Sequence, residues 1–490
     1  MKNKKHAEGS PGRTTAALCV VGFAIASLVL ALAPDRAASG TSSSASWRGS
    51  YHLPRSAQPV RLAIAFDGGR ALVALPGGYS GVRSVPVQRR RDHVRFRLPG
   101  RPSSVAFDGK LTPRSISGTV VQGAVRGTFG LARSTAAPLP ESAPGAYRFP
   151  SGRTIGIVDL GGLRLVDLAS GDIHGLFRSS ATRYRVGSTF GIADPVEGEV
   201  VFSTDGRTLR LSGERAVRVP FRQEEVRFRA GGATLAGTLT LPEGAAPHAA
   251  IAIVHGSGRA SRAGSQIFAA WFAIHGIAVL AYDKRGVGQS GGAYPGGATE
   301  TGIDRLARDA EAAVRFLAAQ PDVDARRIGL WGASQAGWII PLAASRAPVA
   351  FAVIGVGPTV TVGEESFYSD LTNDGEVGGL TASEAEAQLG ETAPSGFDPI
   401  PSIRSLRIPV LWVYGAEDRS IPTHRSVAII QRLRSETGAD FTSIVFPRAG
   451  HSLLETPNGL NTEIGASRRF APGLFDEMIG WLRSRVGPLP

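Results

Sequence analysis

Residues 332–337 read Gly332-Ala333-Ser334-Gln335-Ala336-Gly337 and separate two apolar stretches. The stretch at 327–331 predicts a strand, and the stretch at 338–344 predicts a helix. A serine on a sharp strand-to-helix turn is presented at the end of a sheet, and its neighbours must be small because the turn is tight. Ala336 stands where such turns usually carry glycine. The motif makes Ser334 a candidate nucleophile.

Alternating strands and helices surround this motif along residues 225–490. Apolar strands are predicted at 249–254, 277–282, 328–331, 350–356, 409–414 and 442–446. Helices are predicted at 264–275, 301–320, 337–346, 423–436 and 471–486. Such alternation predicts an α/β fold, in which a mostly parallel sheet is covered by helices on both faces.

A serine nucleophile needs a base to take its proton and an acid to orient that base. Asp418 follows one predicted strand, and His451 follows the next. Because the carboxyl ends of parallel strands meet at one edge of a sheet, Ser334, Asp418 and His451 are expected to form a triad. Glu417 is the alternative acid. Two other histidines, His275 and His424, lie in predicted helices and are expected to be surface or packing residues.

The oxyanion of a tetrahedral intermediate must be met by preorganised N–H donors. The segment Val254-His255-Gly256-Ser257-Gly258 follows an apolar strand and has small residues where the backbone must turn toward the serine. The backbone N–H groups of Ser257 and Gln335 are therefore the predicted donors. Ser257 itself is not expected to be a nucleophile, because no strand-to-helix turn presents it.

Residues 286–291 match the glycine pattern of a dinucleotide-binding loop and follow a strand. The segment at 293–297 predicts no helix, so no helix N-terminus would receive a pyrophosphate, and no nucleotide cofactor is expected. The acidic stretch at 370–375 is not spaced as a calcium loop. Nine scattered histidines and one cysteine predict no metal site.

Four segments together resemble the α/β-hydrolase superfamily: 255–258, 282–290, 331–338 and 450–452. Within it, the chain is similar to bacterial serine esterases and to prolyl-oligopeptidase-like or dienelactone-hydrolase-like enzymes. The resemblance covers about 225–490 and implies an α/β-hydrolase fold with esterase, thioesterase or peptidase activity. It also implies that an insertion at about 363–402 forms a cap over the pocket, with a surface excursion as the alternative.

Before this region the chain predicts short strands and no helices. Strand patterns fill residues 47–134 and 147–222, and a Pro- and Ala-rich stretch at 136–145 predicts a linker. One or two small barrels or sandwiches are expected in this all-β region. Their predicted role is to shield, position or anchor the part that follows.

The first 38 residues have the order of an export signal. Basic residues precede an uncharged apolar run at 16–33, and small residues follow at 37–40. Cleavage is expected near Ala38 or Ser39, which predicts an exported protein in the periplasm, on the cell surface or outside the cell. An uncleaved anchor is the alternative, because the apolar run only just reaches spanning length. Cys19, the only cysteine, lies in this segment, so the mature chain is expected to lack thiols.

The net charge of +13 comes mainly from arginine, since lysine occurs only at positions 2, 4, 5, 110 and 284. The arginine-rich stretch at 89–97 is expected to be a strand with a solvated face. Contact with an anionic lipid or wall polymer, which would bring the β-rich region to the envelope, is the alternative. No nucleic-acid-binding module is recognised, so no nucleic-acid partner is expected.

These patterns predict an exported serine hydrolase that cleaves small acyl esters. An aminopeptidase-like enzyme or an acyl thioesterase is the alternative on the same fold. A peptidase that binds a free N-terminus would need carboxylates near its pocket, and Glu364 and Glu365 are the clustered candidates. A third hypothesis is a non-catalytic protein that binds the cell envelope through the β-rich segments.

Overall fold

The computed structural model describes residues 46–54, 59–67, 70–74, 83–98, 104–134, 143–160 and 162–487. The predicted export signal and most of the predicted linker lie outside these residues. No helix in the described part of the chain is long and apolar enough to cross a membrane.

The first described unit is a closed antiparallel barrel, here called barrel 1. Its strands are β1 (Ser46–His52), β2 (Val60–Asp67), β3 (Arg70–Ala74), β4 (Arg83–Arg90), β5 (His93–Leu98), β6 (Val105–Leu111), β7 (Ser115–Gln122) and β8 (Val125–Ser134). Side chains alternate across the barrel wall, as the period of a strand requires. In β5, Val94, Phe96 and Leu98 are buried while Arg95 and Arg97 are exposed. The arginine-rich stretch therefore has a solvated face, but it forms the turn between β4 and β5 and parts of both strands rather than a single strand.

A second closed antiparallel barrel, barrel 2, follows. Its strands are β9 (Gly145–Arg148), β10 (Thr154–Asp159), β11 (Leu163–Asp167), β12 (Ile173–Arg178), β13 (Arg183–Val186), β14 (Gly198–Phe202), β15 (Thr208–Leu211) and β16 (Glu214–Arg218). Pairing of β9 with β16 closes it. On β10, Ile155 and Ile157 fill the barrel while Val158 packs outward into the core of the next domain. Barrel 2 is thus attached to that domain by an apolar interface.

The rest of the chain is an α/β domain, so the predicted fold class is confirmed. Its sheet has the order β17-β18-β20-β19-β21-β22-β23-β24. The strands are β17 (Arg222–Ala230), β18 (Ala233–Leu241), β19 (His248–Val254), β20 (Ile277–Tyr282), β21 (Val323–Ala333), β22 (Phe351–Gly355), β23 (Val410–Gly415) and β24 (Phe441–Phe446). The strands from β20 to β24 pair in parallel, and the hairpin β17–β18 joins them antiparallel. The sheet begins at Arg222, slightly before the predicted boundary at 225.

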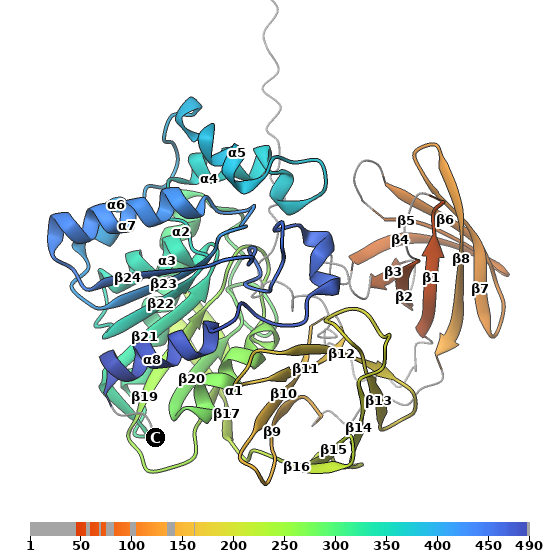
Figure 1. The fold of residues 1–490 in the computed structure, drawn as a ribbon, viewed down its shortest axis with the longest axis horizontal. Coiled ribbons are helices and arrows are strands. Elements are labelled where there is room, and N and C mark those ends of the chain that lie inside the picture. The colour runs from red at the N-terminus through yellow and green to blue at the C-terminus, as the bar shows by residue number, and fades with distance from the viewer. Residues whose placement is uncertain are drawn as a thin grey trace, which may run out of the picture.

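Helices cover both faces of this sheet (Figure 1). One face carries α1 (Gln266–Ile274) and α8 (Leu474–Val486), and the other carries α2 (Glu300–Ala318), α3 (Ala336–Ala344), α6 (Ile400–Ser405) and α7 (Thr423–Thr437). Successive residues of β19 alternate between the two cores: Ile251 and Ile253 face α1, and Ala250 and Ala252 face α2. Each core buries apolar surface that is worth about 25 cal/mol per Å².

The insertion between β22 and β23 forms a small helical layer. It contains α4 (Val362–Leu371) and α5 (Ala382–Ala387), which project beyond the sheet at the top of Figure 1. Tyr368, Ala385 and Leu389 form its own apolar cluster. Thr361 and Thr381 each cap a helix by accepting a hydrogen bond from the N–H of the third helical residue, so both helices begin at well-defined positions.

Candidate active site

Ser334 lies on the sharp turn between β21 and α3. Its φ is +59°, a left-handed conformation that non-glycine residues adopt rarely and mostly where function requires it. The Ser334 N–H donates to the carbonyl of Gly355 on the neighbouring strand at 3.0 Å, which holds the turn. The sequence motif therefore folds into the geometry of a nucleophile elbow.

The small residues around Ser334 are required by close contacts. A Cβ atom at Gly332 would lie 2.6 Å from the Cβ atom of Ala336, and one at Gly337 would lie 2.6 Å from the backbone of Gly357. Ala336 itself is fully buried and fits, because Gly332 has no side chain on the facing position. The departure from glycine at 336 is thus accommodated.

The structure brings together Ser334, His451 and Asp418 at the carboxyl edge of the sheet. The Nε2 atom of His451 lies 3.2 Å from Ser334 Oγ, and its Nδ1 atom lies 2.8 Å from Asp418 Oδ2. All three side chains are buried. The other oxygen of Asp418, Oδ1, accepts the N–H groups of Ser420 and Ile421 at 2.8 and 2.9 Å, so the carboxylate is fixed in its orientation.

The alternatives to these residues are placed elsewhere. Asp418, rather than Glu417, contributes the carboxylate that reaches His451. The imidazole of His424 is exposed on α7 and lies 3.6 Å from Glu386. The ring of His275, at the end of α1, is hydrogen-bonded to the carbonyl of Trp271 at 2.7 Å.

The environment of His451 favours its protonated form. Burial lowers the pKa of the imidazole, but the charge of Asp418 and its hydrogen bond outweigh burial, with a smaller effect from Asp374, so the pKa of His451 lies above its ordinary value of 6.5. An imidazolium that is stabilised in this way is what a general base becomes during catalysis.

The two predicted oxyanion donors come from adjacent strands. Val254 pairs with Gly332, so the chain leaves β19 toward Ser257 next to the point where it leaves β21 toward Gln335. Gln335 precedes the first residue of α3, and no acceptor for its N–H is found among the described residues. Such N–H groups at a helix N-terminus attract negative charge. His255, predicted only as part of this loop, is buried and donates to the carbonyl of Tyr282.

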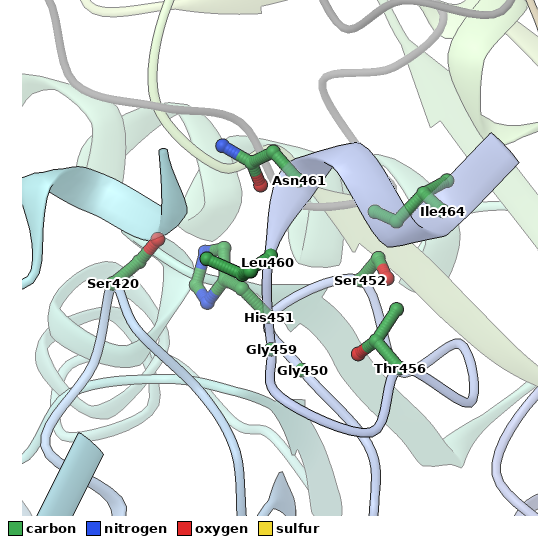
Figure 2. A pocket seen from close by; sticks show the side chains of 9 residues that line it. All are labelled: Ser420, Gly450, His451, Ser452, Thr456, Gly459, Leu460, Asn461 and Ile464. Carbon is green, nitrogen blue, oxygen red and sulfur yellow. The ribbon is translucent and has the colours of Figure 1, made fainter. Parts of the chain in front are cut away.

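A polar pocket lies beside His451 (Figure 2). Its lining combines the acid loop, the histidine loop and the segment before α8: Ser420, Gly450, His451, Ser452, Thr456, Gly459, Leu460, Asn461 and Ile464. In Figure 2 the His451 ring lies between Ser420 and the segment that carries Asn461 and Ile464. The pocket therefore borders His451 on the side of the acid and histidine loops.

The helical insertion is tied to the acid loop. Tyr368 of α4 donates its hydroxyl hydrogen bond to the carbonyl of Asp418 at 2.6 Å, and Ser420 donates to Asp374 at 2.5 Å. The Nδ2 atom of Asn461 donates to the carbonyl of Asp374 at 2.9 Å. The insertion therefore contacts the acid loop and the segment between the histidine loop and α8.

The two carboxylates predicted as ligands for a free N-terminus are not available for that role. Glu364 accepts hydrogen bonds from the Thr361 backbone and hydroxyl at 2.9 and 2.7 Å, which commits its Oε2 atom to the helix cap. Glu365 is buried, and burial together with the charges of Asp374 and Asp418 raises its pKa to about 8. Its carboxyl group is therefore mostly neutral at pH 7.

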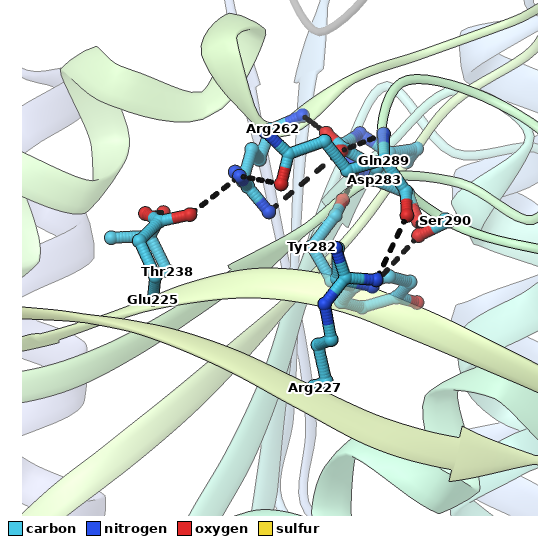
Figure 3. A network of polar contacts seen from close by, with 10 residues as sticks. Glu225, Arg227, Thr238, Arg262, Tyr282, Asp283, Gln289 and Ser290 are labelled. Carbon is cyan, nitrogen blue, oxygen red and sulfur yellow. Dashed lines mark hydrogen bonds and ion pairs between the residues drawn. The ribbon is translucent and has the colours of Figure 1, made fainter.

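The glycine-rich stretch at 286–291 wraps around Asp283 (Figure 3). The Asp283 carboxylate accepts the N–H groups of Arg262 and Gln289, both at 2.9 Å, and Ser290 donates to the Asp283 carbonyl at 2.7 Å. A Cβ atom at Gly288, where φ is +55°, would lie 2.5 Å from that carboxylate. The glycine at 288 thus serves a tight turn, and the next helix, α2, begins only at Glu300.

A segment after the histidine loop docks on barrel 2. We call residues 465–471 the strap. Four backbone hydrogen bonds of 2.7 to 2.9 Å join the strap to barrel 2: Ile173 to Arg468, Phe190 to Ser467, Gly191 to Gly465 and Phe470 to Gly171. On its other side the strap pairs with the histidine loop, through Ala471 N–H to Leu453 O at 2.8 Å and a bridge between Leu454 and Phe470. Figure 1 shows the dark-blue chain between β24 and α8 reaching toward β11 and β12.

Three residues with direct contacts to the site loops do not emerge from the sequence patterns. Lys284 contacts both the loop at 256–258 and Gln335, Tyr368 contacts the acid loop, and Thr189 contacts the strap. Two signals were present for Lys284: it is one of five lysines in an arginine-dominated chain, and it lies just after a buried strand within segment 282–290, which carries the family resemblance. Tyr368 and Thr189 carry no comparable signal.

Among the described residues, no group of three or more His, Cys, Asp and Glu side chains is placed to hold a metal ion. The chemistry that the site offers is that of a buried serine, an imidazole and a carboxylate in hydrogen-bonded sequence. Acyl transfer is the reaction class that uses these groups in this order.

Comparison with known proteins agrees with this reading of the fold. Residues 265–474 match the prolyl oligopeptidase family. An uncharacterized protein of Mycobacterium tuberculosis is 30% identical over 201 residues, which are 40% of this chain and 62% of that protein. This chain therefore covers less than two thirds of that relative's length.

Solved structures of hydrolases also resemble the α/β domain. An esterase of Pyrococcus furiosus is 18% identical, with 55% of this chain and 94% of that chain covered and a TM-score of 0.40. The α/β hydrolase GrgF of Penicillium is 18% identical, with 55% and 100% covered and a TM-score of 0.37. The sheet order and the elbow give the C-terminal part of this chain an α/β-hydrolase fold, and the match of residues 265–474 is consistent with it.

Proposed function

We propose that this protein is an exported serine hydrolase that cleaves acyl esters with Ser334, His451 and Asp418. The observation that supports this most directly is the hydrogen-bonded chain from Ser334 Oγ through His451 to Asp418, with Ser334 on an elbow. The order of these three residues along the chain, their positions after strands and the distances between their side chains all agree with a serine triad.

In the proposed first half-reaction, Ser334 Oγ attacks the ester carbonyl carbon while its proton passes to His451 Nε2. Asp418 accepts the hydrogen bond from Nδ1–H and stabilises the imidazolium that results. The negative charge on the carbonyl oxygen is met by the N–H groups of Ser257 and Gln335. His451 then gives its proton to the alcohol oxygen, and the carbon–oxygen bond breaks to leave an acyl-enzyme.

In the second half-reaction a water molecule replaces the alcohol. His451 takes one proton from the water molecule while the water oxygen attacks the acyl carbon. The same two N–H donors stabilise the second tetrahedral intermediate. Transfer of the proton to Ser334 Oγ releases the acid and restores the enzyme. Overall one water molecule is consumed for each ester bond cleaved.

An ester substrate is favoured over a peptide with a free N-terminus. An aminopeptidase needs a carboxylate anion to pair with the substrate ammonium group, and the two candidates are a capping residue, Glu364, and a neutral buried acid, Glu365. The match of residues 265–474 to the prolyl oligopeptidase family nevertheless supports amide cleavage as a second candidate. An acyl thioesterase would use the same steps.

The test compares the wild-type protein with Ser334→Ala. Turnover is measured on a short p-nitrophenyl ester, an acyl thioester and an aminoacyl p-nitroanilide, and a fluorophosphonate probe reports on the nucleophile. We expect the ester to be the best substrate and the variant to lose both turnover and labelling. Undiminished labelling of Ser334→Ala would reject the assignment, and wild-type protein without any turnover or labelling would favour the non-catalytic hypothesis.

Export and envelope association belong to the same proposal and have separate tests. Residues 1–38 carry the signal pattern, so N-terminal sequencing of the secreted protein should find a start near Ala38 or Ser39. Exposed arginines on barrel 1, such as Arg97, would bind anionic vesicles weakly and in a salt-dependent way. Binding that is unaffected by salt would argue against this electrostatic association.

A further inference from the structure

We propose that Lys284 is a positioning residue that holds the peptide group between Gly256 and Ser257 in the orientation needed for oxyanion stabilisation. The inference rests on the proposed function above, because it concerns the donors assigned there. It adds a residue that the triad chemistry does not itself require.

Lys284 touches both halves of the predicted oxyanion hole. It follows β20 and is 2% exposed. Its ammonium group donates to the carbonyls of Gly256 at 2.7 Å and Gly258 at 3.1 Å, and to the side-chain oxygen of Gln335 at 3.1 Å. An ammonium group has three N–H donors, so these three acceptors use all of them. One side chain thus links the loop at 256–258 to the elbow.

The bond to Gly256 determines where the Ser257 N–H points. The carbonyl of Gly256 and the N–H of Ser257 belong to one planar trans peptide group, in which the two bonds point in opposite directions. While Lys284 holds the carbonyl, the N–H faces away from the ammonium group and the peptide is prevented from flipping. A flipped peptide would present a carbonyl oxygen, and thus negative charge, where the donor belongs. The positive charge also polarises the peptide and strengthens its N–H as a donor.

The choice of lysine fits this geometry better than arginine. The three acceptors surround one nitrogen atom, which suits a compact ammonium group, whereas a guanidinium is a planar fork that suits a carboxylate. The adjacent Arg285 shows the contrast, because it is bound by the Asp309 carboxylate through both Nε and Nη2. Lysine is rare in this chain, yet it occupies this position.

Lys284 is also costly to bury, which argues against a role in stability. Among the described residues, no carboxylate lies within 4.0 Å of its Nζ atom, so backbone and amide dipoles and the ring of Tyr294, 5.6 Å away, offset the charge. Burial lowers the pKa of Lys284 to about 7, with Asp309 partly opposing the shift. A buried charge without a partner of opposite charge destabilises a fold, and such groups gather where function needs them.

The experiment uses Lys284→Met, which keeps the length of the side chain and removes the ammonium group. Lys110→Met, an exposed lysine on β6 of barrel 1, is the matched control. We expect kcat on a p-nitrophenyl ester to fall on the order of 10²-fold, as when one oxyanion donor is lost, while KM changes little. Binding of a boronic acid that forms a tetrahedral adduct on Ser334 should weaken in parallel with kcat. Circular dichroism and thermal melting establish that the compared proteins are folded.

A second variant separates positioning from folding. Gln335→Met removes one of the three acceptors but keeps the Gln335 backbone N–H, so its kcat should fall less than that of Lys284→Met. In the double variant that carries both substitutions, the loss of kcat, expressed as a free energy, should be smaller than the sum of the losses in the two single variants. If Lys284→Met does not fold, Gln335→Met alone decides the outcome. The inference would be overturned if folded Lys284→Met had the kcat and boronate affinity of the wild type. Where only Gln335→Met folds, the same result in that variant would overturn it. The inference would also be overturned if the losses of the two single variants were additive in the double variant. The proposed function would still stand if Ser334→Ala is inactive, so the two failures are distinguishable.

Discussion

The hydroxyl of Thr189 in barrel 2 donates a hydrogen bond of 2.6 Å to the carbonyl of Gly465 in the strap. The same hydroxyl accepts the N–H of Ile192 at 3.0 Å, so it is fixed on both sides. Because the strap pairs with the loop that follows His451, barrel 2 supports the position of the predicted catalytic base. Barrel 2 is therefore linked to the site by specific polar contacts as well as by an apolar interface.

Thr189→Val should disturb this support. The change keeps the shape of the side chain but leaves the Gly465 carbonyl and the Ile192 N–H without this partner, at a cost of about 1–3 kcal/mol. We expect a lower melting temperature and a several-fold lower kcat/KM, measured with the ester assay. Thr154→Val is the control, because its hydroxyl donates only within barrel 2, to Gly152 at 3.3 Å. Equal losses of kcat/KM in both variants would contradict a specific link to the histidine loop.

The elbow should tolerate a smaller residue at 336 but no larger one at 332. Gly332→Ala would place two Cβ atoms 2.6 Å apart, and relief of such overpacking costs about 1–3 kcal/mol. Because the shift falls on the turn itself, fluorophosphonate labelling of Ser334 should drop sharply.

Ala336→Gly is the matched comparison for Gly332→Ala. It removes one methyl group from the first residue of α3, at a cost of about 1 kcal/mol, and should retain labelling. Labelling that survives Gly332→Ala but fails in Ala336→Gly would contradict the packing described for this turn.

The α/β domain was predictable because its information is local. Strands of a parallel sheet are buried on both faces and appear as continuous apolar runs, so β19, β20 and β23 fall within one residue of the predicted ranges. Ser334, Asp418 and His451 each follow such a run, and their order agrees with the resemblance. The closure of the two barrels was harder to predict from the sequence. Alternation of apolar and polar residues indicates a strand with one buried face, but it does not indicate how many strands close into a barrel.

Contacts between a side chain and a distant backbone carbonyl could not be predicted from sequence patterns. Thr189 and Gly465 are 276 residues apart, and the acceptor is a carbonyl that every residue possesses. The same holds for Lys284, whose acceptors include the carbonyls of Gly256 and Gly258. Glu364 and Glu365 show the opposite case: adjacent carboxylates suggested one site, but one side chain caps a helix and the other is buried with a pKa raised to about 8.

The pH dependence of turnover should reflect His451. The imidazole must be neutral to take a proton, and its pKa lies above 6.5, so activity should rise with pH through a value higher than that. Asp418→Asn removes the charge and hydrogen bond that raise the pKa, so the rise should move to lower pH while kcat falls roughly 10⁴-fold. Glu417→Gln is the control and should leave both the profile and kcat unchanged. If the pH dependence of turnover in Asp418→Asn were not shifted, a group other than His451 would control the rise of activity with pH.

Glu365 makes a pH-dependent contribution to stability whose sign follows from its raised pKa. Its carboxyl has a pKa of about 8 in the folded protein against an ordinary 4.5. Below the ordinary value both states are protonated, and the group imposes no penalty. Between the two values the unfolded chain ionises while the folded protein keeps its proton, so stability falls by up to about 1.4 kcal/mol per pH unit.

Glu365→Gln removes this penalty by substituting a neutral amide. The melting temperature of the variant should match that of the wild type near pH 4 and exceed it by a growing margin up to about pH 8, measured by thermal unfolding across this range. Glu384→Gln on α5 is the control with the opposite sign, because hydrogen bonds from Thr381 lower the pKa of Glu384. A pH-independent difference between Glu365→Gln and wild type would mean that Glu365 is ionised in the folded protein.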